Sequence, residues 1–307
     1  MGRARYSATM TIFEPPLWRP PSEGQNLIIQ ATLGCSFNAC TFCSMYKDKP
    51  YRARTLDEVF ADIDAAAADW PEATRVFLAD GDALTLPVDT LVQILDKLAA
   101  TFPDLQRVTC YATPINLNKK SVADLGLLRE KRLTLVYMGV ESGSGDVLKR
   151  IRKGSSKAME SALARAAQAG IKVSATVILG LGGKTHWREH IEQTAALLNR
   201  QPPKFLSTLQ LTLDPDDEAR FFDTFASGGS VGGDDFQWQD DAGVLHELEL
   251  LLQNLNPPKP VIFRSNHASN CLALAGVLPK DGARLIADVR SARTEGCGMR
   301  PNHLRSL

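Results

Sequence analysis

Three of the chain's six cysteines lie close together in the sequence, at Cys35, Cys40 and Cys43. Their spacing is C-x4-C-x2-C, and a large apolar residue, Phe42, stands directly before the last of them. Three thiolates this close together can ligate three irons of a [4Fe–4S] cluster, because such clusters are held by cysteine sulfur. The next cysteine in the sequence is Cys110. The spacing therefore predicts a cluster with three protein ligands, in which one iron stays open for a substrate or a cofactor.

Two other roles for the cysteines stay open at this point. A compact triplet can hold zinc with a histidine or an aspartate as the fourth ligand. The five histidines are remote from the triplet in the sequence and none has finger-like spacing: His186, His190, His246, His267 and His303. Structural disulfides are less favoured, because six cysteines in 307 residues is not the composition of a disulfide scaffold.

The cysteine segment resembles the signature of the radical S-adenosylmethionine superfamily. In that family the open iron binds the amino and carboxylate groups of S-adenosyl-L-methionine, and an aromatic residue such as Phe42 precedes the last cysteine. The usual spacing is C-x3-C-x-aromatic-C, so this sequence has one additional residue between Cys35 and Cys40. The resemblance covers about residues 25–215.

The resemblance implies an enzyme with a [4Fe–4S] cluster and S-adenosyl-L-methionine as cofactors. The reduced cluster would cleave the cofactor to a 5′-deoxyadenosyl radical, which would abstract hydrogen from a substrate that the sequence does not identify. It also implies an external one-electron donor of the flavodoxin or ferredoxin type, and an overall reaction of the oxidoreductase or transferase kind. The altered cysteine spacing keeps open the cleavage of another C–S bond, which yields a 3-amino-3-carboxypropyl radical. A non-catalytic iron–sulfur or zinc protein is the other alternative.

Short β-branched or aliphatic runs alternate along the chain with segments of helical periodicity. We expect strands at 27–32, 74–79, 107–112, 133–140, 172–179, 205–213 and 261–264, and helical spacing marks 56–63, 91–98, 158–169 and 245–252. This alternation predicts an α/β fold, a partial or near-complete parallel (β/α) barrel of six to seven strands with helices outside. Polar and glycine-rich segments follow nearly every strand, at the end where barrel active sites form.

The second predicted strand ends in Asp80-Gly81-Asp82. The segment resembles the Gly-Gly-Glu-like motif that binds the cofactor's amino group in the superfamily, with Gly81 and Asp82 at the matching positions. Glycine lets a backbone approach a ligand closely, and a carboxylate can accept a charge-assisted bond from an ammonium. A plain turn is the alternative, because Asp-Gly is a common turn dipeptide.

Two later strand ends carry further matches. The fourth predicted strand runs into Glu141-Ser142-Gly143, similar to a segment in the branch that includes the methylthiotransferases and the coproporphyrinogen oxidases. The resemblance implies that Glu141 and Ser142 face the ribose or methionine end of the cofactor. After the fifth strand, Ile178 and Gly180 match a glycine-rich motif that contacts adenine, although a glycine-rich loop can also cradle phosphate. A basic run follows Glu141, and an arginine of it could reach the cofactor carboxylate: Lys149, Arg150, Arg152 and Lys153.

Other polar residues near strand ends are candidates to line a substrate cavity or to serve as packing and turn residues. They are Tyr111, Thr113 and Asn116 after the third strand, Gln210 and Thr212 near the sixth, and Arg264, Asn266, His267 and Asn270 near the seventh. The remaining cysteines, Cys110, Cys271 and Cys297, are expected to be core residues or free thiols, with Cys297 in Gly-Cys-Gly as a candidate hydrogen-atom donor.

Composition limits the other classes of function. Lys plus Arg and Asp plus Glu are both 35, so there is no overall electrostatic attraction to nucleic acid or anionic membranes. No apolar run approaches the length that spans a bilayer, and no signal-like stretch follows the N-terminus, so we expect a cytoplasmic protein. We expect an N-terminal extension at residues 1–24, a core barrel at 25–215 and a C-terminal extension closing the barrel at 216–307. A loop is expected at 214–241, where four glycines gather, namely Gly228, Gly229, Gly232 and Gly233.

Overall fold

The computed structural model describes residues 13–228 and 235–305 of the chain. Within these residues an eight-stranded sheet has the order β1-β4-β5-β6-β7-β8-β9-β10. Its strands are β1 (Leu27–Gln30), β4 (Arg75–Ala79), β5 (Arg107–Tyr111), β6 (Leu133–Glu141), β7 (Lys172–Leu179), β8 (Phe205–Gln210), β9 (Val261–Ser265) and β10 (Leu274–Leu278). A separate pair joins β2 (Thr32–Leu33) to β3 (Arg52–Ala53) in antiparallel register.

Ten helices accompany the strands in the described residues. They are α1 (Leu56–Asp69), α2 (Val88–Thr101), α3 (Pro114–Lys119), α4 (Val122–Glu130), α5 (Gly145–Arg150), α6 (Ser156–Gln168), α7 (Gly183–Arg200), α8 (Pro215–Gly228), α9 (Asp241–Asn254) and α10 (Gly282–Glu295). Local capping sets several of their starts. Thr55 and Glu58 form a reciprocal capping box at α1, which satisfies two backbone donors that the first turn leaves free.

The strands follow one another in the sheet in chain order, and the pairs β1–β4, β4–β5, β5–β6, β7–β8 and β8–β9 are parallel. The final strand, β10, pairs antiparallel with β9. Parallel neighbours require long crossovers, usually helical, which explains the alternation read from the sequence. The predicted fold class, a partial or near-complete parallel (β/α) barrel of six to seven strands, is confirmed, although the sheet of the described residues has eight strands. The antiparallel edge strand β10 and the last helix, α10, were not predicted.

The chain divides into two compact units. Of the described residues, the first unit holds 13–38, 45–137 and 166–171, and the second holds 39–44, 138–165 and 172–305 apart from 229–234. The boundaries fall within the segment between β2 and β3, within β6, within α6 and directly before β7. The predicted division at residues 24 and 215 stays a prediction.

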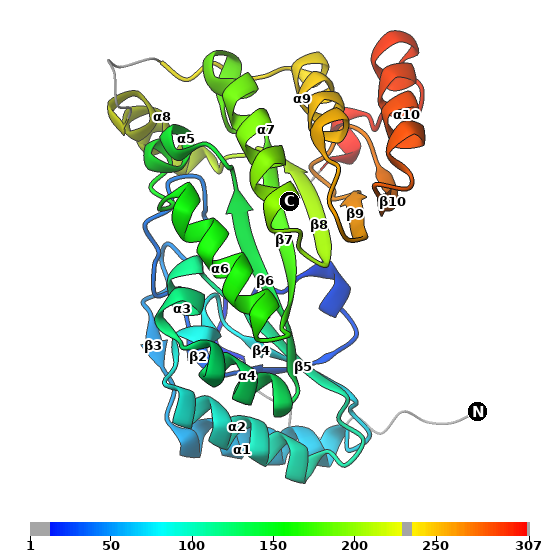
Figure 1. Cartoon of the computed structure of the whole chain (residues 1–307). Helices are drawn as coiled ribbons and strands as arrows, with labels where there is room; N and C mark the ends of the chain where they lie inside the picture. The colour runs from blue at the N-terminus through cyan, green and yellow to red at the C-terminus, as the bar shows by residue number, and fades with distance from the viewer. Residues whose placement is uncertain (1–12, 229–234, 306–307) are drawn as a thin grey trace, which may run out of the picture. The chain divides into compact units, whose positions relative to one another are not determined.

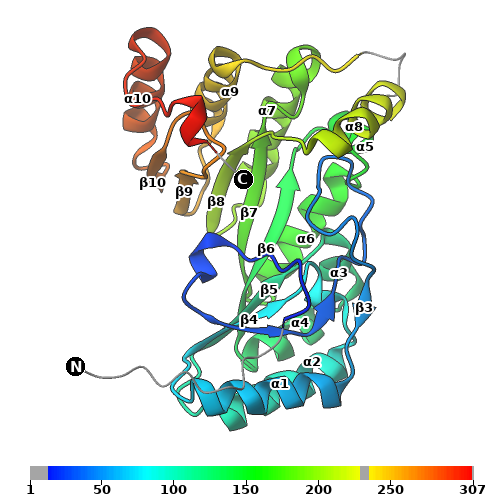
Figure 2. The same cartoon turned by 180° about the vertical axis from the view of Figure 1, so that it is seen from behind.

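Each unit has its own packing. In the first unit α1 and α2 lie side by side (Figures 1 and 2), and the ring of Phe77 meets the rings of Tyr111 and Tyr137 edge to face at 5.2 and 6.3 Å between centroids. In the second unit α9 packs against both α7 and α10 (Figure 1). No helix in the described part of the chain is both long enough and apolar enough to cross a membrane.

The prediction of a loop at 214–241 is wrong for the first half of this segment, because the helix α8 occupies Pro215–Gly228. Phe221 and Phe225 stand one helical turn apart, and both rings lie 4.9 Å from the ring of Phe236, centroid to centroid. Burial of this aromatic cluster stabilises the helix, and the acidic residues of its first turn interact favourably with the helix dipole. Three of the four glycines, Gly229, Gly232 and Gly233, lie outside the described residues.

Candidate functional site

The β2–β3 pair encloses the segment that carries the cysteine motif. Residues 34–51, here called the cysteine loop, connect these two short strands. None of the six cysteines, all of which lie in the described residues, forms a disulfide, and of the three in the loop Cys40 is buried while Cys35 and Cys43 are half-buried. Cys35 belongs to the first unit, whereas Cys40 and Cys43 belong to the second. Among the described residues no group of three or more His, Cys, Asp or Glu side chains is arranged to hold a metal ion.

In the first unit, Gly81 lies against the start of the cysteine loop. A Cβ atom at this position would stand 2.5 Å from Cε2 of Tyr46 and 3.2 Å from Cβ of Cys35. Only glycine permits this approach without a shift of the Tyr46 ring. The structure thus brings together two of the predicted site residues, Gly81 and Cys35.

The neighbouring carboxylate of Asp82 is wholly buried. It accepts hydrogen bonds from the Ser36 hydroxyl, which lies beside Cys35 in the cysteine loop, and from the Asn116 side-chain amide. Burial raises the pKa of Asp82 to about 6, although these donors and the Lys120 ammonium oppose the shift. Asp82 therefore ties the cysteine loop to α3, which carries Asn116. The sequence had placed Asn116 among the substrate-cavity candidates.

In the second unit, Glu141 pairs with Lys153. Lys153 Nζ lies 3.2 Å from Glu141 Oε1 and 5.8 Å from the centroid of the Phe42 ring. Burial lowers the pKa of Lys153, but the negative charges of Cys40, Glu141 and Cys43 outweigh it and raise that pKa well above its usual range. The other carboxylate oxygen, Glu141 Oε2, is buried and has no hydrogen-bond partner in the described residues.

Of the basic run after Glu141, Lys153 thus contacts two of the predicted site residues, Glu141 and Phe42, and the approach of an arginine to the cofactor stays a prediction. Arg150 has a different role, because the residue is 1% exposed and its guanidinium nitrogens donate to neighbouring residues. Its guanidinium lies 2.7 Å from Asp146 Oδ2 and donates a bond of 2.7 Å to the Phe225 carbonyl. Arg150 therefore anchors α5 to α8.

His190 connects two further predicted residues, Ser142 and Ile178. Its ring nitrogens lie 2.7 Å from the Ser142 hydroxyl oxygen and 3.0 Å from the Ile178 carbonyl oxygen. Burial lowers the pKa of His190 to about 4, so the imidazole is neutral at pH 7. Since a carbonyl can only accept, Nε2 carries the proton and Nδ1 accepts from Ser142. The sequence offered His190 only as a remote histidine.

Gly180 is held by a residue that the sequence did not indicate. Its N–H donates to Glu247 Oε2 at 2.6 Å, and Gln239 donates to Glu247 Oε1 at 3.1 Å. Glu247 lies on α9 with no exposed surface, and burial raises its pKa to about 8. The sequence did contain one indication of a buried Glu247, because this glutamate lies between Leu245 and Leu248, two apolar positions of the helix.

A cavity of about 700 Å³ lies in the second unit. Its lining includes Gln210, Thr212, Asp241, Ser269 and Arg305, with a bidentate ion pair between Asp241 and Arg305. The structure therefore brings together Gln210 and Thr212, two of the predicted cavity residues.

The remaining cavity candidates have other surroundings. Asn270 is buried and bonds the backbone of β8, and His267 bonds Ser269, whereas Arg264 and Asn266 are exposed. In the first unit, Tyr111 packs on Phe77 and Thr113 caps α3. These contacts account for the positions of the side chains without a ligand.

Comparison with known proteins identifies a family whose model matches this chain. The model of a family described as the radical SAM superfamily matches residues 29–198. Coproporphyrinogen III oxidase from Escherichia coli, described as a radical SAM enzyme, is similar in structure with a TM-score of 0.51 and 16% identity, over 74% of this chain and 52% of that one. Methylornithine synthase is similar with a TM-score of 0.50 and 15% identity, over 86% and 68% of the two chains.

A third similar structure is the radical S-adenosylmethionine methyltransferase TsrM from Kitasatospora setae, with cobalamin and a [4Fe–4S] cluster bound. Its TM-score is 0.49 and its identity 16%, over 60% of this chain and 36% of that one. The chain thus spans about a third of this methyltransferase and about half of the coproporphyrinogen oxidase. No curated protein matches the chain. At these identities the likeness concerns the fold.

Proposed function

The chain belongs to the radical S-adenosylmethionine superfamily, and we propose that it binds a [4Fe–4S] cluster through Cys35, Cys40 and Cys43. The donor set fits such a cluster, because none of the three residues is in a disulfide and cysteine sulfur is the usual cluster ligand. The open iron would bind S-adenosyl-L-methionine. The chemistry that these groups would supply is one-electron cleavage of the C5′–S bond of S-adenosyl-L-methionine, which would give methionine and a 5′-deoxyadenosyl radical able to abstract hydrogen from the substrate.

One observation carries this proposal. Lys153 Nζ lies over the ring of Phe42, which stands between Cys40 and Cys43 in the sequence, and it also pairs with Glu141. The part of the cysteine motif that belongs to the second unit, Cys40 to Cys43, is therefore close to the Glu-Ser-Gly segment, although about a hundred residues separate the two in the sequence. The ammonium favours thiolates at Cys40 and Cys43, since a nearby positive charge stabilises the deprotonated form.

The surrounding residues are suited to hold the cofactor. Glu141 keeps one buried carboxylate oxygen free to accept a hydrogen bond from a cofactor hydroxyl or ammonium. Neutral His190 fixes the Ser142 hydroxyl and the Ile178 carbonyl in place. Glu247 fixes the backbone at Gly180. In the first unit, Asp82 holds Ser36 next to Cys35.

The remaining parts of the proposal rest on the family. A flavodoxin- or ferredoxin-type protein would supply the electron, and a cytoplasmic location would suit an oxygen-sensitive cluster. Gln210 and Thr212, at the cavity beside Asp241 and Arg305, are the residues that we propose to contact a polar substrate.

The test is analysis of the products of S-adenosyl-L-methionine. Protein reconstituted with iron and sulfide without oxygen, and then reduced with dithionite, should form 5′-deoxyadenosine and methionine, measured by liquid chromatography and mass spectrometry. Formation of methylthioadenosine instead would show that another C–S bond breaks, as a 3-amino-3-carboxypropyl radical requires. Formation of neither, with zinc in place of iron, would contradict the proposed function.

A further inference from the structure

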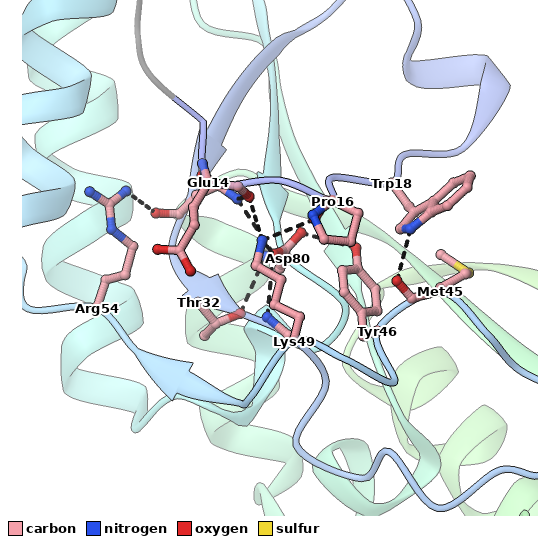
Figure 3. A network of polar contacts seen from close by, with 11 residues as sticks. Glu14, Pro16, Trp18, Thr32, Met45, Tyr46, Lys49, Arg54 and Asp80 are labelled. Atoms are coloured by element: carbon pink, nitrogen blue, oxygen red, sulfur yellow. Dashed lines mark hydrogen bonds and ion pairs between the residues drawn. The ribbon is translucent and has the colours of Figure 1, made fainter.

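Asp80, the residue before Gly81, forms a buried polar network that the predicted cofactor site does not include. Its side chain has no exposed surface. One carboxylate oxygen accepts from the Tyr46 hydroxyl at 3.0 Å, and the other lies 2.7 Å from Lys49 Nζ. Figure 3 shows both side chains directed at Asp80. The backbone N–H of Gly34 also donates to this carboxylate, at 3.3 Å.

These three donors lie at the two ends of the cysteine loop. Gly34 immediately precedes Cys35, whereas Tyr46 and Lys49 follow Cys43. The ends are also in direct contact, because a Cβ atom on Gly34 would clash with the carbonyl oxygen of Lys49. Gly34 has φ +65°, a conformation that favours glycine. Asp80 thus joins both ends of the loop at its base.

The ammonium of Lys49 has three hydrogen-bond acceptors within the first unit. Besides Asp80, it donates to the backbone carbonyls of Glu14 and Pro16 (Figure 3). Lys49 is 4% exposed, so neither member of the ion pair is appreciably hydrated. A buried pair of this kind contributes little net stability compared with apolar residues, although loss of one partner is costly. Stability alone therefore gives a weak reason for a charged pair at this place.

Tyr46 connects the network to Gly81. Its hydroxyl donates to Asp80, and its ring occupies the space that a side chain at residue 81 would need. Burial, followed by the charge of Asp80, raises the pKa of Tyr46 far above its usual value, so the hydroxyl stays a donor at any ordinary pH. Asp80, Tyr46 and Gly81 therefore set the surroundings of Cys35 together.

We propose that Asp80, Lys49 and Tyr46 form a positioning clamp, which holds the base of the cysteine loop so that the Cys35 thiol is presented to the cluster. All the contacts that support the clamp lie within the first unit. The link between the clamp and a cluster rests on the proposed function. Residues that orient metal ligands through hydrogen bonds typically change metal affinity by roughly 10- to 100-fold when they are replaced.

The first test uses protein without a cluster. Tyr46→Phe removes the hydroxyl but keeps the ring, and Asp80→Asn removes the charge. Tyr137→Phe is the matched control, because the Tyr137 hydroxyl also donates to a buried carboxylate of the first unit, Glu23, outside the cysteine loop. The measurement is the rate at which N-ethylmaleimide alkylates Cys35, followed by peptide mass spectrometry. We expect a rate about ten times higher in the clamp variants, equivalent to about 1.4 kcal/mol, and an unchanged rate in Tyr137→Phe.

The second test uses the reconstituted protein. Cluster iron should be lost to a chelator roughly 10- to 100-fold faster in Tyr46→Phe and Asp80→Asn than in the wild type and Tyr137→Phe, and the paramagnetic resonance signal of the reduced cluster should change. Wild-type chelator resistance with a wild-type signal in both clamp variants would overturn the inference, as would unchanged alkylation of Cys35. If Asp80→Asn does not fold, Tyr46→Phe decides alone. A wild type that binds no cluster contradicts the proposed function, and alkylation of Cys35 then still decides whether the clamp exists.

Discussion

Lys153 and Glu141 form an ion pair, with 3.2 Å between Nζ and Oε1, in which 15% and 7% of the two side chains are exposed. Lys153 also lies over the ring of Phe42 and interacts electrostatically with Cys40 and Cys43. A poorly hydrated cation at this place stabilises negative charge on sulfur more strongly than a hydrated one would. The pair therefore connects the proposed cluster ligands to the proposed cofactor-binding carboxylate.

The first prediction concerns that cation. Lys153→Met should make the cluster harder to reduce, because loss of a nearby positive charge disfavours the added electron. The reduction potential, measured by redox titration and paramagnetic resonance, should become more negative. Lys149→Met is the control, since Lys149 is exposed on α5, and an equal shift in both variants would show that only net charge matters.

The second prediction concerns the cluster ligands. Reconstituted wild type should contain about four irons and four sulfides per chain. Replacement of Cys35, Cys40 or Cys43 by alanine should abolish this content, which is measured by iron and sulfide assay. Cys110→Ala, Cys271→Ala and Cys297→Ala should keep it, because two of these thiols are buried and the third is exposed outside the cysteine loop. A full cluster in Cys40→Ala would refute the assignment of the ligands.

The third prediction concerns the carboxylate that keeps a free oxygen. Glu141→Ala should retain the cluster but bind S-adenosyl-L-methionine roughly ten- to a hundredfold more weakly, since a hydrogen bond to a charged group contributes roughly 1.5–3 kcal/mol. Calorimetric titration of the oxygen-free protein measures the affinity. Glu160→Ala serves as the control, because Glu160 pairs with Arg200 instead. Wild-type affinity in Glu141→Ala would remove Glu141 from the cofactor site.

The fourth prediction concerns pH. Burial raises the pKa of Glu247 to about 8 in the folded chain, above the ordinary glutamate value that holds in the unfolded chain. The folded state therefore favours the protonated acid, and this contribution to stability is complete below about pH 4.5 and is lost as the pH rises to about 8. Urea unfolding of the cluster-free protein between pH 5 and 8 should show the decline in wild type and a smaller one in Glu247→Gln. Glu295→Gln, at an exposed carboxylate, should behave like wild type, and an identical decline in Glu247→Gln would show that Glu247 does not cause it.

The sequence by itself determined the class of the protein, seven strands of the sheet and four of the helices in the described residues. The cysteine spacing needs only nine residues to be recognised, and the strand runs and helical periodicities are local patterns of side-chain type. All seven predicted strand segments correspond to observed strands for this reason. The helix α8 was missed because the glycines and acidic residues of 214–241 favoured a loop, and the apolar face of Phe221 and Phe225 becomes evident only where Phe236 packs against it.

The tertiary structure alone decided which side chains act together. Asp80 lies 31 residues from Lys49, His190 lies 48 from Ser142, and Glu247 lies 67 from Gly180. No periodicity or motif links such pairs, because each contact depends on how the chain folds back and on the burial of both partners. Burial also gives these polar groups their chemistry, since a carboxylate or an imidazole without access to water must find its hydrogen bonds inside the protein. The sequence thus identified the proposed cluster ligands. The tertiary structure showed which residues position these cysteines and which cation, Lys153, lies near two of them.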